Sequence, residues 1–162
     1  MFTKSINQDY VRSIVFGFQD ALVSTTGIVV GISAAVNNRN YILLTAAVTI
    51  IVEALSMAAG QYLSEKSVHD LPKSNHRDNL FYGSILMFLS YIIGGIIPVI
   101  PFLFSFSTWT PILSVFSSFA GLFILGYLKD KLFIKKSNHG SIEMLIVGGF
   151  TVLIGLLIGS LF

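Results

Sequence analysis

The chain has 162 residues, of which 54% are hydrophobic and only 11% are charged, and its mean hydropathy is +0.80. This composition excludes an ordinary soluble domain, because a soluble helical bundle needs polar outer faces that these apolar stretches lack. The net charge of +2 gives no reason to expect a nucleic-acid partner, and the absence of cysteine excludes disulfides and thiolate metal sites.

The charged residues are clustered and leave five long apolar segments, each close to or above the ~20 residues that cross ~30 Å of hydrocarbon. We therefore predict an all-α integral membrane protein with a single five-helix transmembrane domain over residues 1–162. The first segment is too long for a cleaved signal and contains Asp20, so we predict that it is retained. The predicted helices cover residues of about 11–36, 41–63, 80–103, 111–128 and 142–162.

The basic residues predict the orientation in the membrane. Nine of the ten Lys and Arg residues lie in the N-terminal segment and in the predicted loops 64–79 and 129–141, and only Arg39 lies on the opposite side. The positive-inside rule then predicts a cytoplasmic N-terminus, cytoplasmic loops 64–79 and 129–141, and a C-terminus that is outside or lumenal. The expected location is the plasma membrane in a prokaryote and a vacuolar or other endomembrane in a eukaryote.

Two carboxylates lie inside the apolar segments, Asp20 in the first and Glu53 in the second. Ionisable groups at membrane depth are costly and usually belong to a functional site. Asp20 is predicted roughly 13 Å and Glu53 roughly 15 Å from the cytoplasmic ends of two antiparallel helices, so both lie at one level. Because no Lys, Arg or His is predicted at that depth, the two acids must either carry protons or bind a cation.

Met57 follows Glu53 by one helical turn and lies on the same face. Two carboxylates and a thioether suit a divalent transition metal, since the oxygens supply charge and the softer sulfur favours iron-like ions over magnesium. Met57 alone is also compatible with simple packing in the core. We predict a metal site of Asp20, Glu53 and Met57, with Ser24 and Gln61 as candidate accessory residues.

Small and polar residues recur every three or four positions along the first segment and include Gly17, Gly27 and Gly31. This spacing predicts a helix-packing face that ends in a Gly-x-x-x-Gly pattern. The spacing leaves two partners open, namely the second helix of the same chain and the first helix of a second copy.

Signatures of soluble enzymes are missing from the sequence. It contains no phosphate-binding glycine loop, and its three histidines lie in predicted cytoplasmic loops, so a Ser–His hydrolase inside the membrane would lack its base. We predict that the protein is not an enzyme and needs no cofactor.

Residues 12–27 and 53–64 resemble the vacuolar iron transporter (VIT) family, and residues 95–101, 125–129 and 148–149 add supporting matches. The resemblance extends over essentially the whole chain. It implies five helices, a homodimer with the first helix near the two-fold axis, and export of ferrous or manganous ions from the cytosol in exchange for protons. It also implies that Asp20, Glu53 and Met57 lie along the ion path.

The chain departs from the family pattern in three ways. Ala21 replaces a frequent glycine, Gln61 replaces a frequent glutamate, and the loop 64–79 is too short for the acidic metal-collecting domain of many members. We predict a transporter that exports Fe²⁺ and/or Mn²⁺ by proton antiport, with the metal as substrate rather than cofactor and the lipid bilayer as surroundings. The alternatives are a channel or carrier for another cation, and a membrane scaffold that transports nothing.

Overall fold

The computed structural model describes residues 8–70, 79–104, 107–133 and 140–161. Within these residues the chain forms five α-helices and no β-strand, which confirms the predicted all-α class. The helices are α1 (Gln8–Ala35), α2 (Arg39–His69), α3 (Leu80–Phe104), α4 (Thr110–Phe133) and α5 (Gly140–Gly159).

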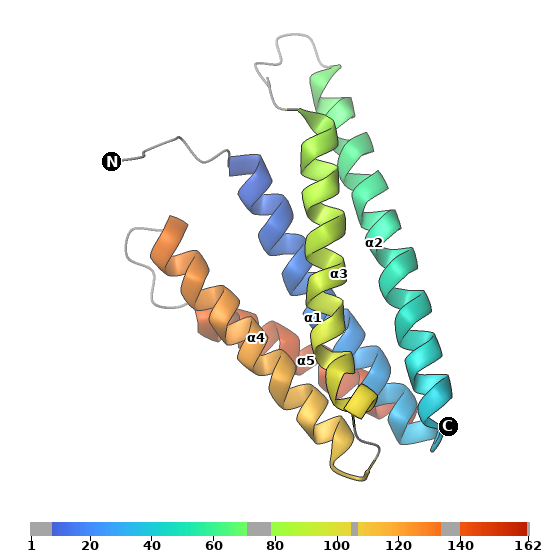
Figure 1. The fold of residues 1–162 in the computed structure, drawn as a ribbon. Coiled ribbons are helices and arrows are strands. Elements are labelled where there is room, and N and C mark those ends of the chain that lie inside the picture. Colours follow the sequence, from blue (N-terminus) through green and yellow to red (C-terminus); the bar gives the residue numbers. More distant parts are fainter. Residues whose placement is uncertain (1–7, 71–78, 105–106, 134–139, 162) are drawn as a thin grey trace.

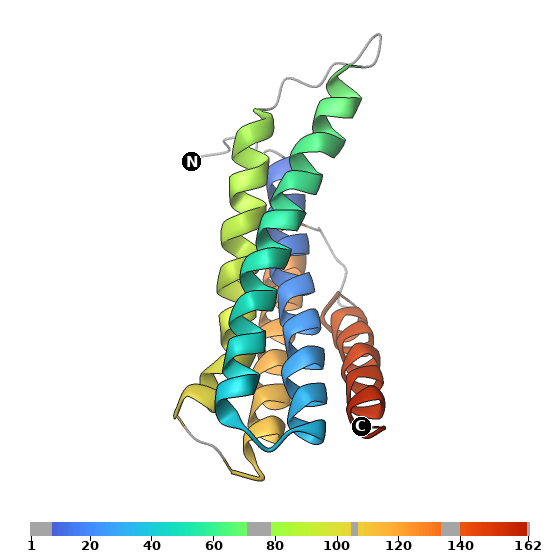
Figure 2. The same ribbon diagram turned by 90° about the vertical axis from the view of Figure 1, so that its right-hand side faces the viewer.

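Consecutive helices run in opposite directions, so that α1 and α3 begin and α2 and α4 end at the upper end of the molecule in Figure 1. Helix α1 is central, because it contacts each of the other four helices. Within the described residues, helix α2 packs only against α1 and α3, whereas α5 packs only against α1 and α4. Figure 2 shows the resulting face, on which α1 lies between α2 and α5.

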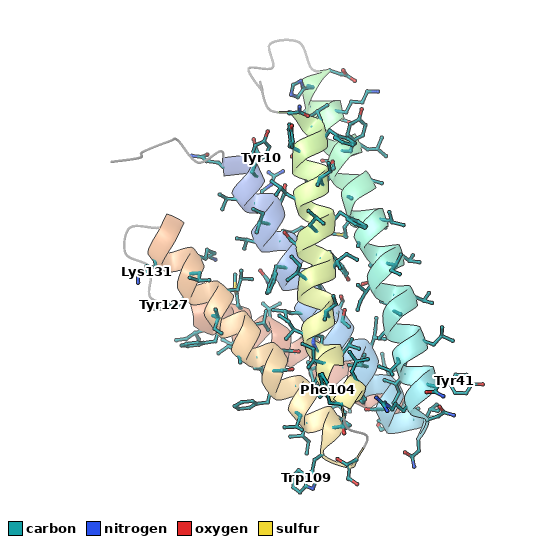
Figure 3. All side chains as sticks on the ribbon, in the orientation of Figure 1. Tyr10, Tyr41, Phe104, Trp109, Tyr127 and Lys131 are labelled. Atoms are coloured by element: carbon teal, nitrogen blue, oxygen red, sulfur yellow. The ribbon has the colours of Figure 1, made fainter. Side chains whose placement is uncertain are left out.

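Four of the helices are long and apolar enough to cross a membrane, and the matching part of α5, Met144–Gly159, is shorter. Large apolar side chains cover the outer surface, as expected for a protein surrounded by lipid. Tyr41 and Trp109 lie exposed near the lower end and Tyr10 lies near the upper end (Figure 3), the positions that aromatic side chains favour at the two membrane interfaces. The orientation of these ends relative to the cytoplasm stays a prediction.

Two helices extend beyond their predicted ends. Helix α2 continues to His69 and α4 continues to Phe133, both into segments that we had assigned to loops. Backbone hydrogen bonding does not stop where the apolar residues stop. In α2, Lys66 and His69 also lie in the last turn, where basic side chains interact favourably with the helix dipole.

The turn between α1 and α2 sets these two helices antiparallel. The side chain of Asn38 caps α2 by accepting hydrogen bonds from the backbone N–H groups of Asn40 (3.0 Å) and Tyr41 (3.4 Å). Arg39 is the one Lys or Arg residue predicted on the non-cytoplasmic side of the membrane. It donates to the carbonyl oxygens of Phe102 (2.7 Å) and Leu103. The start of α2 is thereby tied to the end of α3.

Helix α3 remains helical through Pro98 and Pro101. Pro101 lacks the N–H that would bond to the Ile97 carbonyl oxygen, and Ser117 Oγ of α4 donates to that oxygen at 3.5 Å. Ser114 Oγ donates to the Pro98 carbonyl oxygen at 2.6 Å. Hydroxyl groups of α4 therefore supply hydrogen bonds to the part of α3 that the prolines weaken.

The small residues of α1 contact two other helices of the same chain. A Cβ atom at Gly17 would lie 2.9 Å from the Met87 carbonyl oxygen of α3. A Cβ atom at Gly31 would lie 2.7 Å from the Gly155 carbonyl oxygen of α5. A Cβ atom at Gly27 would be nearest to Thr151 of α5. The Gly-x-x-x-Gly pattern of α1 thus faces α5 within the chain and not α2, whereas packing against a second copy stays a prediction. Spacing defines a face of a helix but does not identify the helix that it meets.

Candidate metal site

The Glu53 carboxylate lies where three helices meet. Glu53 is half-buried on α2, and its Oε2 atom accepts a hydrogen bond from the Tyr91 hydroxyl of α3. The Ser24 hydroxyl of α1 lies 3.3 Å from the same Oε2 atom and 2.7 Å from the Tyr91 oxygen. One membrane acid is therefore surrounded by two hydroxyl groups from the neighbouring helices.

Asp20 lies one turn before Ser24 on α1 and is also half-buried. It is close enough to Glu53 for the two carboxylates to interact electrostatically. The structure thus brings Asp20, Ser24 and Glu53 into one region, from helices joined by the short turn at residues 36–38.

Met57 lies one turn after Glu53 and is half-buried. It packs against a small buried cluster formed by Ala21, Ala54 and Tyr91. Met57 is therefore near the residues that surround Glu53, and its role as a soft donor stays a prediction.

Gln61 has a different neighbour. Its side-chain amide donates to the carboxylate of Glu65, one turn further along α2. Glu65 borders a cavity of about 70 Å³ at the upper end of the bundle, which is lined by Asp9, Arg12, Ser64, Glu65, Val68, His69 and Leu80. Of the two candidate accessory residues, the structure places Ser24 at Glu53 and Gln61 beside this end cavity.

The carboxylates near Glu53 do not form a complete metal site on their own. Among the described residues, no group of three or more His, Cys, Asp or Glu side chains could hold a metal ion. The possible ligands around Glu53 are two carboxylates, a thioether and hydroxyl groups. A divalent transition metal held there would need further ligands, either water molecules or groups from another chain.

Tyr91 is the residue that sequence reasoning missed. It is completely buried on α3, although its hydroxyl contacts the half-buried Glu53. A tyrosine in an apolar helix suggests packing or an interface position, which is why it did not stand out. The available signal was its depth, because Tyr91 lies roughly 17 Å from the start of α3, a depth similar to that predicted for the two acids.

A groove of about 500 Å³ runs along the surface between α1 and α5 and reaches Ser24. The groove is open, and its surface is almost entirely apolar. Its lining residues are Ser24, Gly27, Ile28, Gly31, Ile32, Ala35, Thr151, Ile154, Gly155, Ile158 and Gly159.

Long apolar helices around a pair of acids define a multi-pass membrane protein with a polar site inside its apolar region. Comparison with protein families supports the same class. The model of the VIT family matches residues 11–81 and 72–160, which together span nearly the whole chain. The chain belongs to the VIT family, as the sequence had indicated.

Two curated relatives come from Arabidopsis thaliana. The chain is 27% identical to vacuolar iron transporter homolog 4 over 111 residues, which cover 61% of this chain and 56% of that protein. It is 33% identical to vacuolar iron transporter homolog 3 over 70 residues, which cover 43% of this chain and 35% of that protein. The chain therefore matches little more than half of the first relative and about a third of the second.

Proposed function

We propose that the protein exports divalent transition-metal ions, Fe²⁺ and/or Mn²⁺, from the cytosol in exchange for protons. The observation that carries this proposal is the pairing of Asp20 and Glu53 inside apolar helices of a VIT family member. Met57 beside them adds the soft donor that favours a transition metal over magnesium.

The chemistry of two neighbouring acids supports an exchange of metal for protons. Two carboxylates at membrane depth are costly while both are charged, so either protons or a cation must offset their charge. A metal ion that arrives from the cytoplasm displaces the protons and binds to Asp20, Glu53 and Met57. When the site opens to the opposite side, the metal leaves and protons return.

A second copy of the chain would complete the site. Asp20 and Glu53 are only half-buried in a single chain, and the groove beside Ser24 is open and apolar. In a bilayer an uncovered acid would face hydrocarbon, which is unfavourable. We infer a homodimer in which the α1–α5 groove faces its copy and α1 lies near the two-fold axis, so that ligands can come from both chains.

The dimer can be tested by a single cysteine, because the natural sequence contains none. We expect Ile28→Cys, in the groove, to form a disulfide-linked dimer in oxidised membranes, since a residue near a two-fold axis meets its own copy. Phe116→Cys, which is 73% exposed on α4, is the matched control and should stay monomeric on a non-reducing gel. Equal cross-linking of the two variants, or none at Ile28→Cys, would contradict this interface.

Metal tolerance in cells gives a first test of the function. In a host that lacks its own exporter, we expect the protein to raise the tolerated concentrations of Mn²⁺ and Fe²⁺, measured in separate growth assays. Glu53→Gln should remove this protection, whereas Asp70→Asn, an exposed acid at the end of α2, should retain it. A wild type that gives no protection would indicate a scaffold or a carrier of another ion, and equal protection by the wild type and Glu53→Gln would rule out Glu53 as a ligand.

A further inference from the structure

Tyr91 has a position that its packing alone does not explain. We propose that Tyr91 is a positioning residue that holds the Glu53 carboxylate for metal binding. This inference rests on the proposed transport function and adds a specific residue to it. Three observations support it, namely the hydrogen bonds of the hydroxyl, the confinement of the ring, and the carboxylate oxygen of Glu53 that remains open to a metal ion.

The hydrogen bonds form a chain with a defined direction. Tyr91 has a single hydroxyl hydrogen, which it donates to Glu53 Oε2. Its oxygen, 2.7 Å from Ser24 Oγ, is therefore left to accept the Ser24 hydrogen. The order runs from Ser24 to Tyr91 to Glu53, so that α1 and α3 together orient an acid of α2.

The tyrosine ring is held firmly in place. Tyr91 is 0% exposed and packs against Ala21 of α1 and Ala54 of α2. One turn further on, α3 makes close contacts with both helices. A Cβ atom at Gly94 would lie 2.7 Å from the Phe18 carbonyl oxygen, and one at Gly95 would lie 2.9 Å from Ile50 Cγ1. The hydroxyl is therefore confined to the space beside Glu53.

This geometry leaves one oxygen of Glu53 for the metal. Tyr91 occupies Oε2, so a metal ion can bind through Oε1 while the hydroxyl still stabilises the charge on the other oxygen. Phenylalanine at position 91 would remove this donor and its hold on the carboxylate.

The test compares the Mn²⁺ transport kinetics of Tyr91→Phe and the wild type in proteoliposomes that are given a Mn²⁺ gradient. We expect the KM for Mn²⁺ to rise roughly tenfold, the scale of a lost hydrogen bond to a charged group, with a much smaller change in Vmax. Ser24→Ala should shift the KM in the same direction but less, because the Tyr91–Glu53 bond remains.

Tyr82→Phe is the matched control, since it makes the same change on the same helix at a side chain that is 58% exposed. It should leave the KM and the Vmax unchanged. A second measurement tests binding without transport. It is the Mn²⁺ concentration that gives half of the maximal rise in the thermal unfolding midpoint of the purified protein, and this concentration should rise similarly in Tyr91→Phe. If Tyr91→Phe does not fold, Ser24→Ala decides both measurements.

The outcomes separate this inference from the proposed function. A wild type without metal flux contradicts the function itself. A wild type that transports, with an unchanged KM in Tyr91→Phe, overturns only the role of Tyr91. A fall in Vmax with an unchanged KM also overturns it, because that pattern indicates a purely structural tyrosine.

Discussion

Asp20→Asn is expected to abolish metal transport while leaving the fold intact. Asparagine keeps the shape of the side chain but removes the charge, and a single carboxylate at Glu53 cannot hold a divalent ion as two can. Losing a residue that supports a ligand already costs about 10–100-fold in metal affinity, so losing a ligand should cost about 100-fold or more. The half-buried position of Asp20 leaves room for this nearly isosteric change without strain.

The effect of Asp20→Asn is best measured as initial rates of Mn²⁺ and Fe²⁺ uptake in proteoliposomes, at equal amounts of monodisperse protein. Asp70→Asn is the control, because it removes the same charge from an exposed position at the end of α2. Transport by Asp20→Asn within a fewfold of the wild type would rule out Asp20 as a ligand and would leave Glu53 without its assumed partner.

Gly155→Ala is expected to destabilise the protein strongly. The new Cβ atom would lie 2.5 Å from the Gly27 carbonyl oxygen and 3.0 Å from the Gly27 Cα atom. These are backbone atoms, which cannot rotate away as a flexible side chain can, so α1 and α5 must move apart. Overpacking typically costs about 1–3 kcal/mol, and we expect the upper part of this range here.

Gly60→Ala provides the matched control for Gly155→Ala. Gly60 is exposed on α2, and a Cβ atom at this position would have no neighbour within 4 Å. The same substitution should be neutral there or stabilising by up to about 1 kcal/mol, through helix propensity. The measurement is the midpoint of thermal unfolding in detergent. Equal midpoints for the two variants would show that the close contact of α1 with α5 is not required for stability.

The sequence was sufficient to predict the five helices because the thickness of the bilayer sets a minimum length for apolar segments. It was less informative about where helices end. The predictions for α2 and α4 stopped at the last apolar residues, whereas the helices run on to His69 and Phe133. Beyond the apolar region the helix is stabilised by its own backbone hydrogen bonds and by its terminal charges, which hydropathy does not register.

The proximity of Asp20 and Glu53 could be anticipated, because a short connection between two membrane helices forces them to be antiparallel neighbours. The contact between Glu53 and Tyr91 could not. The two residues are 38 positions apart in the sequence and lie on different helices, and their contact depends on the rotation of α3 about its own axis. Close contacts at Gly94 and Gly95 contribute to that rotation, and they depend on three-dimensional packing.

The bond between Gln61 and Glu65 shows the reverse case. These residues are four positions apart on one helix, a spacing at which polar side chains interact, so the pair could have been predicted from the sequence. The bond also changes how the missing glutamate at position 61 should be interpreted. A carboxylate is still present one turn further along α2, beside the cavity at the upper end of the bundle.

The central claim, exchange of metal for protons at Asp20 and Glu53, is tested most directly by recording both fluxes in one experiment. Proteoliposomes containing a metal-sensitive dye and a pH-sensitive dye are given a Mn²⁺ gradient, with Glu53→Gln as the comparison. We predict Mn²⁺ movement accompanied by protons in the opposite direction for the wild type, and neither flux for Glu53→Gln. Mn²⁺ movement without proton movement, or equal fluxes in both proteins, would contradict the account.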